Sequence, residues 1–149
     1  MPPPPAYLLD TNVLIEYARA SIAGAALEAK YQFQASSFKP LVCIVTIGKV
    51  WAFAQHRNWA QPKRDRLQKL IDHLVQVDIN SRDVLADYAD IHTFTVKNGF
   101  AIGDNDIWIA SAAKATGATL ITTDKDFDPL HSAYIRRIHV DPKTGAMTI

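Results

Sequence analysis

Residues 103–124, GDNDIWIASAAKATGATLITTD, contain the sequence of a helix followed directly by that of a strand. Aspartates follow Gly103, where negative charge favours a helix start, and Gly117 stands where glycine commonly ends a helix. Residues 118–124 are a short apolar run that ends at Asp124 and is typical of a buried strand. A capped helix that leads directly into a buried strand predicts an α/β fold.

The same alternation runs through the rest of the chain. Further strands are expected at residues 7–10, 41–46, 75–79 and 134–141. Helical sequence lies between them, with Pro62 at one helix start and Ser81 as the cap of another. Short apolar strands that alternate with helices predict a three-layer α/β/α domain with a mainly parallel, five-stranded sheet.

The composition is that of a globular chain. Of 149 residues, 48% are hydrophobic and 21% are charged, which is enough apolar material for a sizeable core. The net charge of +1 argues against a strongly basic or acidic surface over the whole chain. No signal peptide or membrane-spanning run is evident, so we expect a cytoplasmic protein with no membrane partner. We expect a disordered proline-rich leader at residues 1–5 and one domain from 6 to 149.

Three aspartates are expected at one edge of the predicted sheet. Asp10 and Asp124 end two strands, and Asp106 lies in the first turn of the helix before the second of them. Ligands of parallel sheets bind beyond the carboxyl ends of the strands, so the three carboxylates are expected to converge there. Each also has a simpler interpretation, because aspartate at a helix start caps backbone N–H groups.

Carboxylates held together repel one another, which raises their pKa values unless a cation neutralises them. A set of oxygen ligands suits Mg²⁺ or Mn²⁺, and such a site activates water and stabilises charge on a phosphodiester. The sequence therefore predicts a Mg²⁺ or Mn²⁺ site at Asp10, Asp106 and Asp124.

Three segments, LLDTNVLIEY, VTIGKVWAF and GDNDIWIASAAKATGATLITTDKDFD, together resemble the PIN-domain ribonucleases, in particular the VapC-like toxins of type II toxin–antitoxin systems. The resemblance covers nearly the whole chain after the leader, and NDIWIA followed by TLITTDKDF is its most specific part. It implies a PIN-like fold, endoribonuclease activity with Mg²⁺ or Mn²⁺, and a homodimer. It also implies a cognate antitoxin protein whose C-terminal segment enters the active-site groove.

The resemblance assigns roles by position. It implies that Asp10 and Asp106 ligate the metal directly and that Asp124 is the fourth acid of the set. Asp126 is the neighbouring alternative to Asp124. The residues expected to shape the pocket beside these acids are Thr11 and Asn12.

One position departs from the family. The second acid of the pattern is a glutamate in the helix after the second strand, and the matching residue here is Lys49. With Thr46 as the N-cap of that helix, glutamate at position 49 would also complete a capping box and favour the helix dipole. A lysine in the catalytic set opposes metal entry, so we expect weak or absent catalysis in this chain.

The sequence leaves three explanations of Lys49 open. In the first, Lys49 is an inactivating substitution. In the second, the chain is a natural pseudo-enzyme, or Glu16 replaces the missing acid in its site. In the third, Lys49 points into solvent.

Two functions are alternatives to the nuclease. One is a non-catalytic PIN-fold binding module, and the other is a haloacid-dehalogenase-like phosphatase, which LLDTNV also resembles although Asn12 stands where that family has its second aspartate.

An RNA surface is predicted around residues 55–66. Arg57, Lys63 and Arg64 lie near Trp59, and basic residues beside an aromatic ring bind phosphates and stack bases. A charged helix start over a buried tryptophan explains the same residues without RNA.

Overall fold

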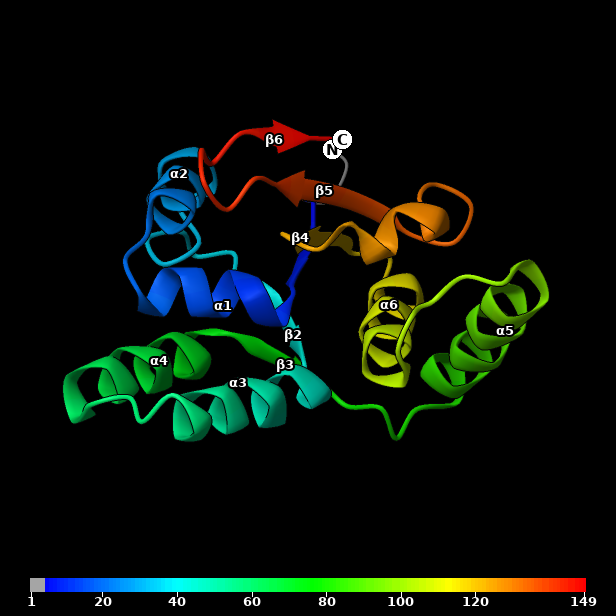
Figure 1. Ribbon diagram of the computed structural model, residues 1–149, viewed down its shortest axis with the longest axis horizontal. Coiled ribbons are helices and arrows are strands. Elements are labelled where there is room, and N and C mark those ends of the chain that lie inside the picture. The colour runs from blue at the N-terminus through cyan, green and yellow to red at the C-terminus, as the bar shows by residue number, and fades with distance from the viewer. Residues whose placement is uncertain (1–4) are drawn as a thin grey trace.

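The computed structural model describes residues 5–149, in which a single sheet runs through the centre of the molecule (Figure 1). Its strands are β1 (Tyr7–Leu9), β2 (Leu41–Cys43), β3 (Val75–Val77), β4 (Thr119–Thr122), β5 (Arg136–Val140) and β6 (Met147–Thr148). They are ordered β3-β2-β1-β4-β5-β6, and all neighbours pair in parallel except β5 and β6. The predicted leader lies outside the described residues, apart from the exposed Pro5.

The sheet has six strands in the described part of the chain, so the predicted number of five was wrong. The additional strand, β6, has two residues and pairs antiparallel with the end of β5. Two residues are too short to show the alternation that identifies a strand in a sequence. The mainly parallel character of the sheet was predicted correctly.

Helices cover both faces of the sheet. They are α1 (Thr11–Ala18), α2 (Ile22–Tyr31), α3 (Ile44–His56), α4 (Gln61–His73), α5 (Arg82–Asn98), α6 (Asp104–Thr116) and the 3-10 helix η1 (Lys125–Leu130). Helices α1 to α4 lie on one side of the strands in Figure 1, and α5 and α6 lie on the other. The three-layer α/β/α prediction is therefore confirmed.

Two apolar clusters hold these layers together. Leu9 of β1 and Ile121 of β4 belong to the cluster under α1 to α4, whereas Leu8 and Leu120 belong to the cluster under α5 and α6. Successive side chains of a strand point to opposite faces, so each central strand contributes to both clusters. No helix within residues 5–149 has the length and apolar character required to cross a membrane.

The second strand is shorter than predicted, and this changes the position of Lys49 in its helix. Strand β2 pairs with β3 only as far as Cys43, which is the N-cap of α3, so residues 44–46 are helical although they form a β-branched run. Thr46 is consequently inside the first turn and is not the N-cap. Lys49 lies in the second turn, and the capping-box argument for a glutamate there was wrong.

Helices α1 and α2 approach each other closely at Gly24. A Cβ atom at this position would lie 2.7 Å from the backbone oxygen of Glu16, so there is no room for a side chain. We expect Gly24→Ala to lower the free energy of unfolding by about 1–3 kcal/mol, measured by chemical denaturation. Gly48→Ala is the matched control, because no heavy atom lies within 4 Å of its Cβ position in α3. It should raise stability by about 0.5–1 kcal/mol, and a loss of equal size at both positions would contradict this packing argument.

Candidate active site

An acidic pocket lies beyond the carboxyl ends of β1 and β4. The cavity has a volume of about 210 Å³. Its lining consists of Asp10, Thr11, Asn12, Ile15, Lys49, Phe53, Asp106 and Asp124. The structure thus brings together residues that are more than a hundred positions apart in the chain, because β1 and β4 are neighbours in the sheet, with Leu9 beside Ile121.

Asp10 is the most deeply buried acid of this pocket. Its side chain caps α1, and the residue is only 2% exposed. One carboxylate oxygen accepts a hydrogen bond from the Thr11 backbone N–H, and the other accepts one from the Thr122 hydroxyl, each at 2.7 Å. Burial raises the pKa of Asp10 to about 6, against the smaller opposing effect of these two hydrogen bonds.

Lys49 enters the pocket and contacts Asp106. The Nζ atom of Lys49 lies 3.4 Å from Oδ1 of Asp106, and the two side chains are 31% and 18% exposed. Burial raises the pKa of Asp106, while the Lys49 ammonium acts in the opposite direction and Asp124 adds to the rise. The interpretation in which Lys49 only points into solvent was therefore wrong. Glu16, the candidate replacement acid, is not among the described residues that line this pocket.

Asp124 and Asp126 both lie close to Asp106. Asp124 caps η1, where its Oδ1 accepts a hydrogen bond from the Asp126 backbone N–H at 2.8 Å. Carboxylate oxygens of Asp106, Asp124 and Asp126 all lie within 4.8 Å of one another. Asp124 lines the pocket itself, whereas Asp126 is exposed beside it. The two alternatives for the fourth acid are thus adjacent, and both can reach a cation at Asp106.

Thr122 is part of this site and was missed by the sequence analysis. The residue is fully buried, and its hydroxyl donates to Asp10 and accepts a hydrogen bond from the Asp124 backbone N–H at 2.9 Å. It therefore links the acids that follow two different strands. The hydroxyl residue in the apolar run before Asp124 could have indicated a role in the site. Threonine is common in strands for other reasons, however, so this signal is weak.

We expect Thr122→Val to raise the pKa of Asp10 above about 6. The substitution removes a hydrogen bond that stabilises the ionised carboxylate and leaves the Asp124 N–H without its partner. The loss of stability should be about 1–3 kcal/mol. An NMR titration of the Asp10 carboxyl carbon measures the pKa, and Thr122→Ser is the control because it keeps the hydroxyl. An unchanged Asp10 pKa in Thr122→Val would show that the Thr122 hydrogen bond does not stabilise the ionised Asp10 carboxylate.

The residues of the predicted RNA surface do not form one group in the structure. Trp59 is 7% exposed, so its ring is not available for base stacking, and that part of the prediction was wrong. Lys63 covers the Trp59 ring at 4.9 Å, and Arg64 donates to the Trp59 carbonyl at 2.9 Å. Arg57 differs from these two residues, since its guanidinium carbon lies 5.3 Å from the ring centroid of Phe53, which lines the acidic pocket.

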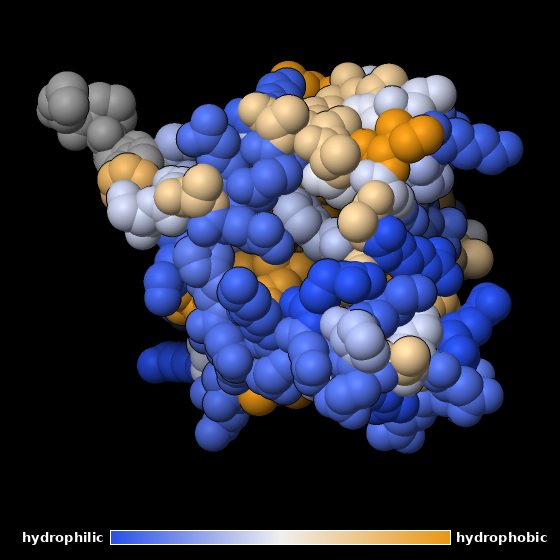
Figure 2. Space-filling model, turned by 90° about the vertical axis from the view of Figure 1, so that its left-hand side faces the viewer, coloured by the Kyte–Doolittle hydropathy of each residue, from blue (hydrophilic) through white to orange (hydrophobic). Residues whose placement is uncertain are grey.

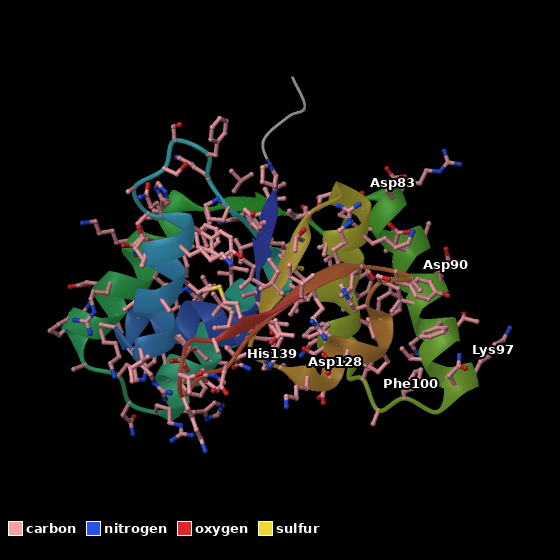
Figure 3. All side chains as sticks on the ribbon, turned by 90° about the horizontal axis from the view of Figure 1, so that it is seen from above. Asp83, Asp90, Lys97, Phe100, Asp128 and His139 are labelled. Atoms are coloured by element: carbon pink, nitrogen blue, oxygen red, sulfur yellow. The ribbon has the colours of Figure 1, made fainter. Side chains whose placement is uncertain are left out.

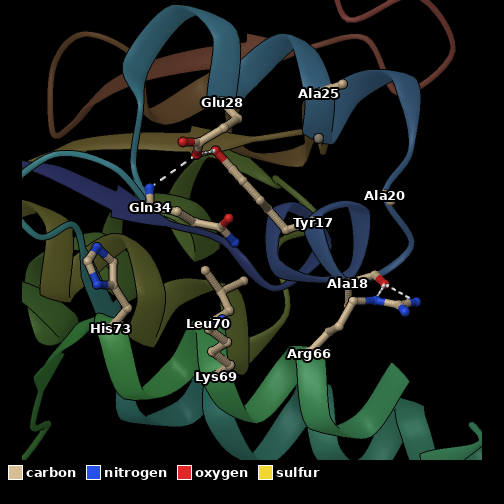
Figure 4. Close-up of a pocket in the computed structure, with 11 residues that line it drawn as sticks. Tyr17, Ala18, Ala20, Ala25, Glu28, Gln34, Arg66, Lys69, Leu70 and His73 are labelled. Atoms are coloured by element: carbon tan, nitrogen blue, oxygen red, sulfur yellow. Dashed lines mark hydrogen bonds between the residues drawn. The ribbon is translucent and has the colours of Figure 1, made fainter. Parts of the chain in front are cut away.

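Two larger cavities lie outside the acidic pocket. One, of about 600 Å³, lies between α1, α2 and α4 and is open to the surface (Figure 4), on a side of the molecule where apolar areas are recessed among hydrophilic side chains (Figure 2). Tyr17 donates to Glu28 within it at 3.1 Å, and Arg66 donates to the Ala18 carbonyl at its edge. The other, of about 560 Å³, lies alongside β5, with Asp128 and His139, which Figure 3 labels, in its lining. Neither contains a predicted catalytic residue.

Comparisons with known proteins agree with this fold. A family model described as PIN domain matches residues 7–130. The chain is 25% identical to a protein named Ribonuclease VapC2 from Haemophilus influenzae over 118 residues, which are 79% of this chain and 86% of that protein. Among solved structures, VapBC2 from Rickettsia felis bound to a promoter DNA fragment has a similar fold, with a TM-score of 0.75 and 20% identity over 89% of this chain and 96% of that chain. VapBC-1 from nontypeable Haemophilus influenzae gives a TM-score of 0.69 at 20% identity, over 90% and 97% of the two chains.

Proposed function

This chain belongs to the PIN domain family, and from that premise we propose that it is a VapC-like ribonuclease toxin whose metal site is impaired by Lys49. The observation that carries the proposal is the meeting of Asp10, Asp106 and Asp124 in one pocket, with the Lys49 ammonium 3.4 Å from one of them. The 25% identity to Ribonuclease VapC2 supports the same substrate class.

The donor atoms of the pocket fit a divalent cation. Mg²⁺ and Mn²⁺ prefer oxygen ligands, and the carboxylates of Asp106, Asp124 and Asp126 lie close enough to share one ion, with Asp10 in the lining of the same pocket. The hydroxyl of Thr11 is buried beside the pocket and makes no hydrogen bond with the described residues, so the protein itself leaves this polar group without a partner. Asp10 and Asp106 would hold the ion, with Asp124 or Asp126 as the further acid. When bound, the ion supplies an activated water and offsets charge on the phosphodiester.

The residues of the chain itself affect this metal site in two opposite ways. The Thr11 N–H and the Thr122 hydroxyl fix the orientation of the Asp10 carboxylate, so both of its oxygens are held before any ligand arrives. The Lys49 ammonium already compensates the charge of Asp106, which a metal would otherwise do. We infer that the parent chain binds the ion weakly and cleaves RNA slowly or not at all.

The partners follow from the same proposal. Solved complexes with a similar fold include VapBC-5 from Mycobacterium tuberculosis, described as a member of a family of toxin–antitoxin systems, with a TM-score of 0.67. By analogy we propose RNA as the substrate and a cognate antitoxin as the regulator. We further propose that residues 6–149 form one domain that acts as a homodimer in the cytoplasm.

A second candidate is a binding module that keeps the fold and cuts nothing, which the Lys49–Asp106 ion pair favours. Incubation of Lys49→Glu protein with a mixture of structured RNAs, in Mn²⁺ or in EDTA, separates these functions. The nuclease proposal predicts RNA fragments only with metal, and no hydrolysis of a phosphomonoester such as p-nitrophenyl phosphate. A folded variant that binds RNA but never cuts it would support the binding module. Hydrolysis of the monoester alone would favour the phosphatase.

A further inference from the structure

The mouth of the acidic pocket carries a group of residues that the catalytic set does not use. Phe53 of α3 lines the pocket, and two arginines lie against its ring. The guanidinium carbons of Arg19 and Arg57 are each 5.3 Å from the ring centroid. Arg19 is the C-cap of α1 and Arg57 is the C-cap of α3, so two helices bring their last residues to one aromatic side chain.

Phe53 and Arg57 lie on the same face of α3 as Lys49. Lys49, Phe53 and Arg57 are spaced by four residues, which places them on one face of the helix. Lys49 contacts Asp106 in the pocket, Phe53 forms part of the wall, and Arg57 is exposed one turn further out. A path of alternating cationic and aromatic groups therefore leads from the acidic pocket to the surface.

The two arginines have no acidic partner in the described part of the chain. The ion pairs found within residues 5–149 involve Lys49, Lys114 and Arg137, and neither Arg19 nor Arg57 takes part in one. Taken one at a time, each arginine is stabilised where it lies by the negative end of its helix and by the Phe53 ring. Two guanidinium groups beside one ring, however, concentrate positive charge at the mouth of the pocket, and an anionic ligand there would offset it.

We propose that Arg19, Phe53 and Arg57 form a subsite for the nucleotide adjacent to the phosphodiester in the acidic pocket. The guanidinium groups bind the backbone phosphate, and the base packs on Phe53 or on a guanidinium plane, a combination typical of single-stranded RNA recognition. This inference rests on the proposed function, in which the substrate is RNA. An acidic peptide would also pair with the arginines, but it would gain nothing from a neighbouring phosphodiester site and offers no base to stack.

Binding of a fluorescently labelled single-stranded RNA of mixed sequence tests the subsite without requiring cleavage. The full chain is titrated in Mg²⁺ at several salt concentrations, and the variant Arg19→Gln/Arg57→Gln is compared with the parent. We expect about tenfold weaker binding, and a slope of log affinity against log salt that is smaller by about 0.7 for each phosphate that the variant no longer binds. Phe53→Leu should weaken binding about fivefold or more with little change in the slope.

The matched control is Arg82→Gln/Lys97→Gln, which removes the same charge from exposed positions on α5. Figure 3 shows Lys97 on α5 at the periphery of the molecule, away from Asp128 and His139. Weaker binding by the Arg19/Arg57 variant alone supports the subsite, provided that its unfolding transition matches that of the parent. Equal binding of RNA by the two double variants contradicts the subsite, but it does not contradict the proposal that RNA is the substrate. The subsite is also overturned if the Arg19/Arg57 variant binds RNA like the parent and binds only an Asp- and Glu-rich peptide more weakly. If the parent binds no RNA at all, both the subsite and the proposed function are wrong.

Discussion

Replacement of Lys49 by glutamate is expected to raise the rate of metal-dependent RNA cleavage at least about 100-fold over that of the parent chain. The change removes a positive charge 3.4 Å from Asp106 and adds a carboxylate to the metal pocket. A contact between unit charges at about 4 Å is worth on the order of 4 kcal/mol at an effective dielectric of about 20. Partial solvent exposure of Lys49 reduces this energy. Each 1.4 kcal/mol that remains changes the metal affinity, and with it the cleavage rate, by about a factor of ten.

The measurement is the initial rate of cleavage of a defined RNA at fixed Mn²⁺. Lys49→Met separates the two parts of the effect, because it removes the ammonium and adds no ligand. We expect its rate to fall between those of the parent and Lys49→Glu. If parent and Lys49→Glu cleave equally fast, the lysine does not control the site, and the role assigned to it in this pocket is wrong.

Asp10→Asn is expected to stabilise the metal-free protein at neutral pH and to abolish cleavage in the Lys49→Glu background. Burial raises the folded-state pKa of Asp10 to about 6, above the ordinary value of 3.8. The folded state therefore binds the Asp10 proton more tightly than the unfolded state does. This contribution to stability is fully present below about pH 4, and it is lost as the pH rises through about 6.

The size of this effect follows from the pKa difference. About two pKa units correspond to roughly 3 kcal/mol as an upper bound, so we expect Asp10→Asn to be about 1–3 kcal/mol more stable than the parent at pH 7.5. The difference should disappear near pH 4, where both side chains are neutral. Urea denaturation in EDTA at the two pH values measures it, with the exposed Asp90→Asn as the control. Lower stability of Asp10→Asn at pH 7.5 would show that the ionised carboxylate is not destabilising.

Much of this architecture was predictable because it follows from local pattern. Capped helices and apolar runs showed where the layers lie, and Ser81 does cap α5 through a hydrogen bond to the Val84 N–H. The end of β2 was not predictable, since it depends on where pairing with β3 stops, at Cys43 and Val77. The β-branched run after Cys43 favours a strand by composition, but no neighbouring strand continues to pair with it.

The site shows the same division between local and long-range causes. Convergence of Asp10, Asp106 and Asp124 followed from the rule that strand ends meet at one edge of a parallel sheet. The role of Thr122 did not follow, because its hydroxyl reaches Asp10 only when β1 and β4 are neighbours. Similarly, the direction of the Lys49 side chain depends on α3 packing beside the start of α6, which the sequence alone does not specify.

The most direct test of the role of Lys49 is calorimetric titration of Mn²⁺ into the parent chain and into Lys49→Glu under identical conditions. We expect Lys49→Glu to bind Mn²⁺ about 10–100-fold more tightly, because the ammonium beside Asp106 is replaced by a ligand. Asp106→Asn added to Lys49→Glu should remove this gain. Equal Mn²⁺ affinity of the parent and Lys49→Glu would contradict the proposal that Lys49 opposes metal binding in this pocket.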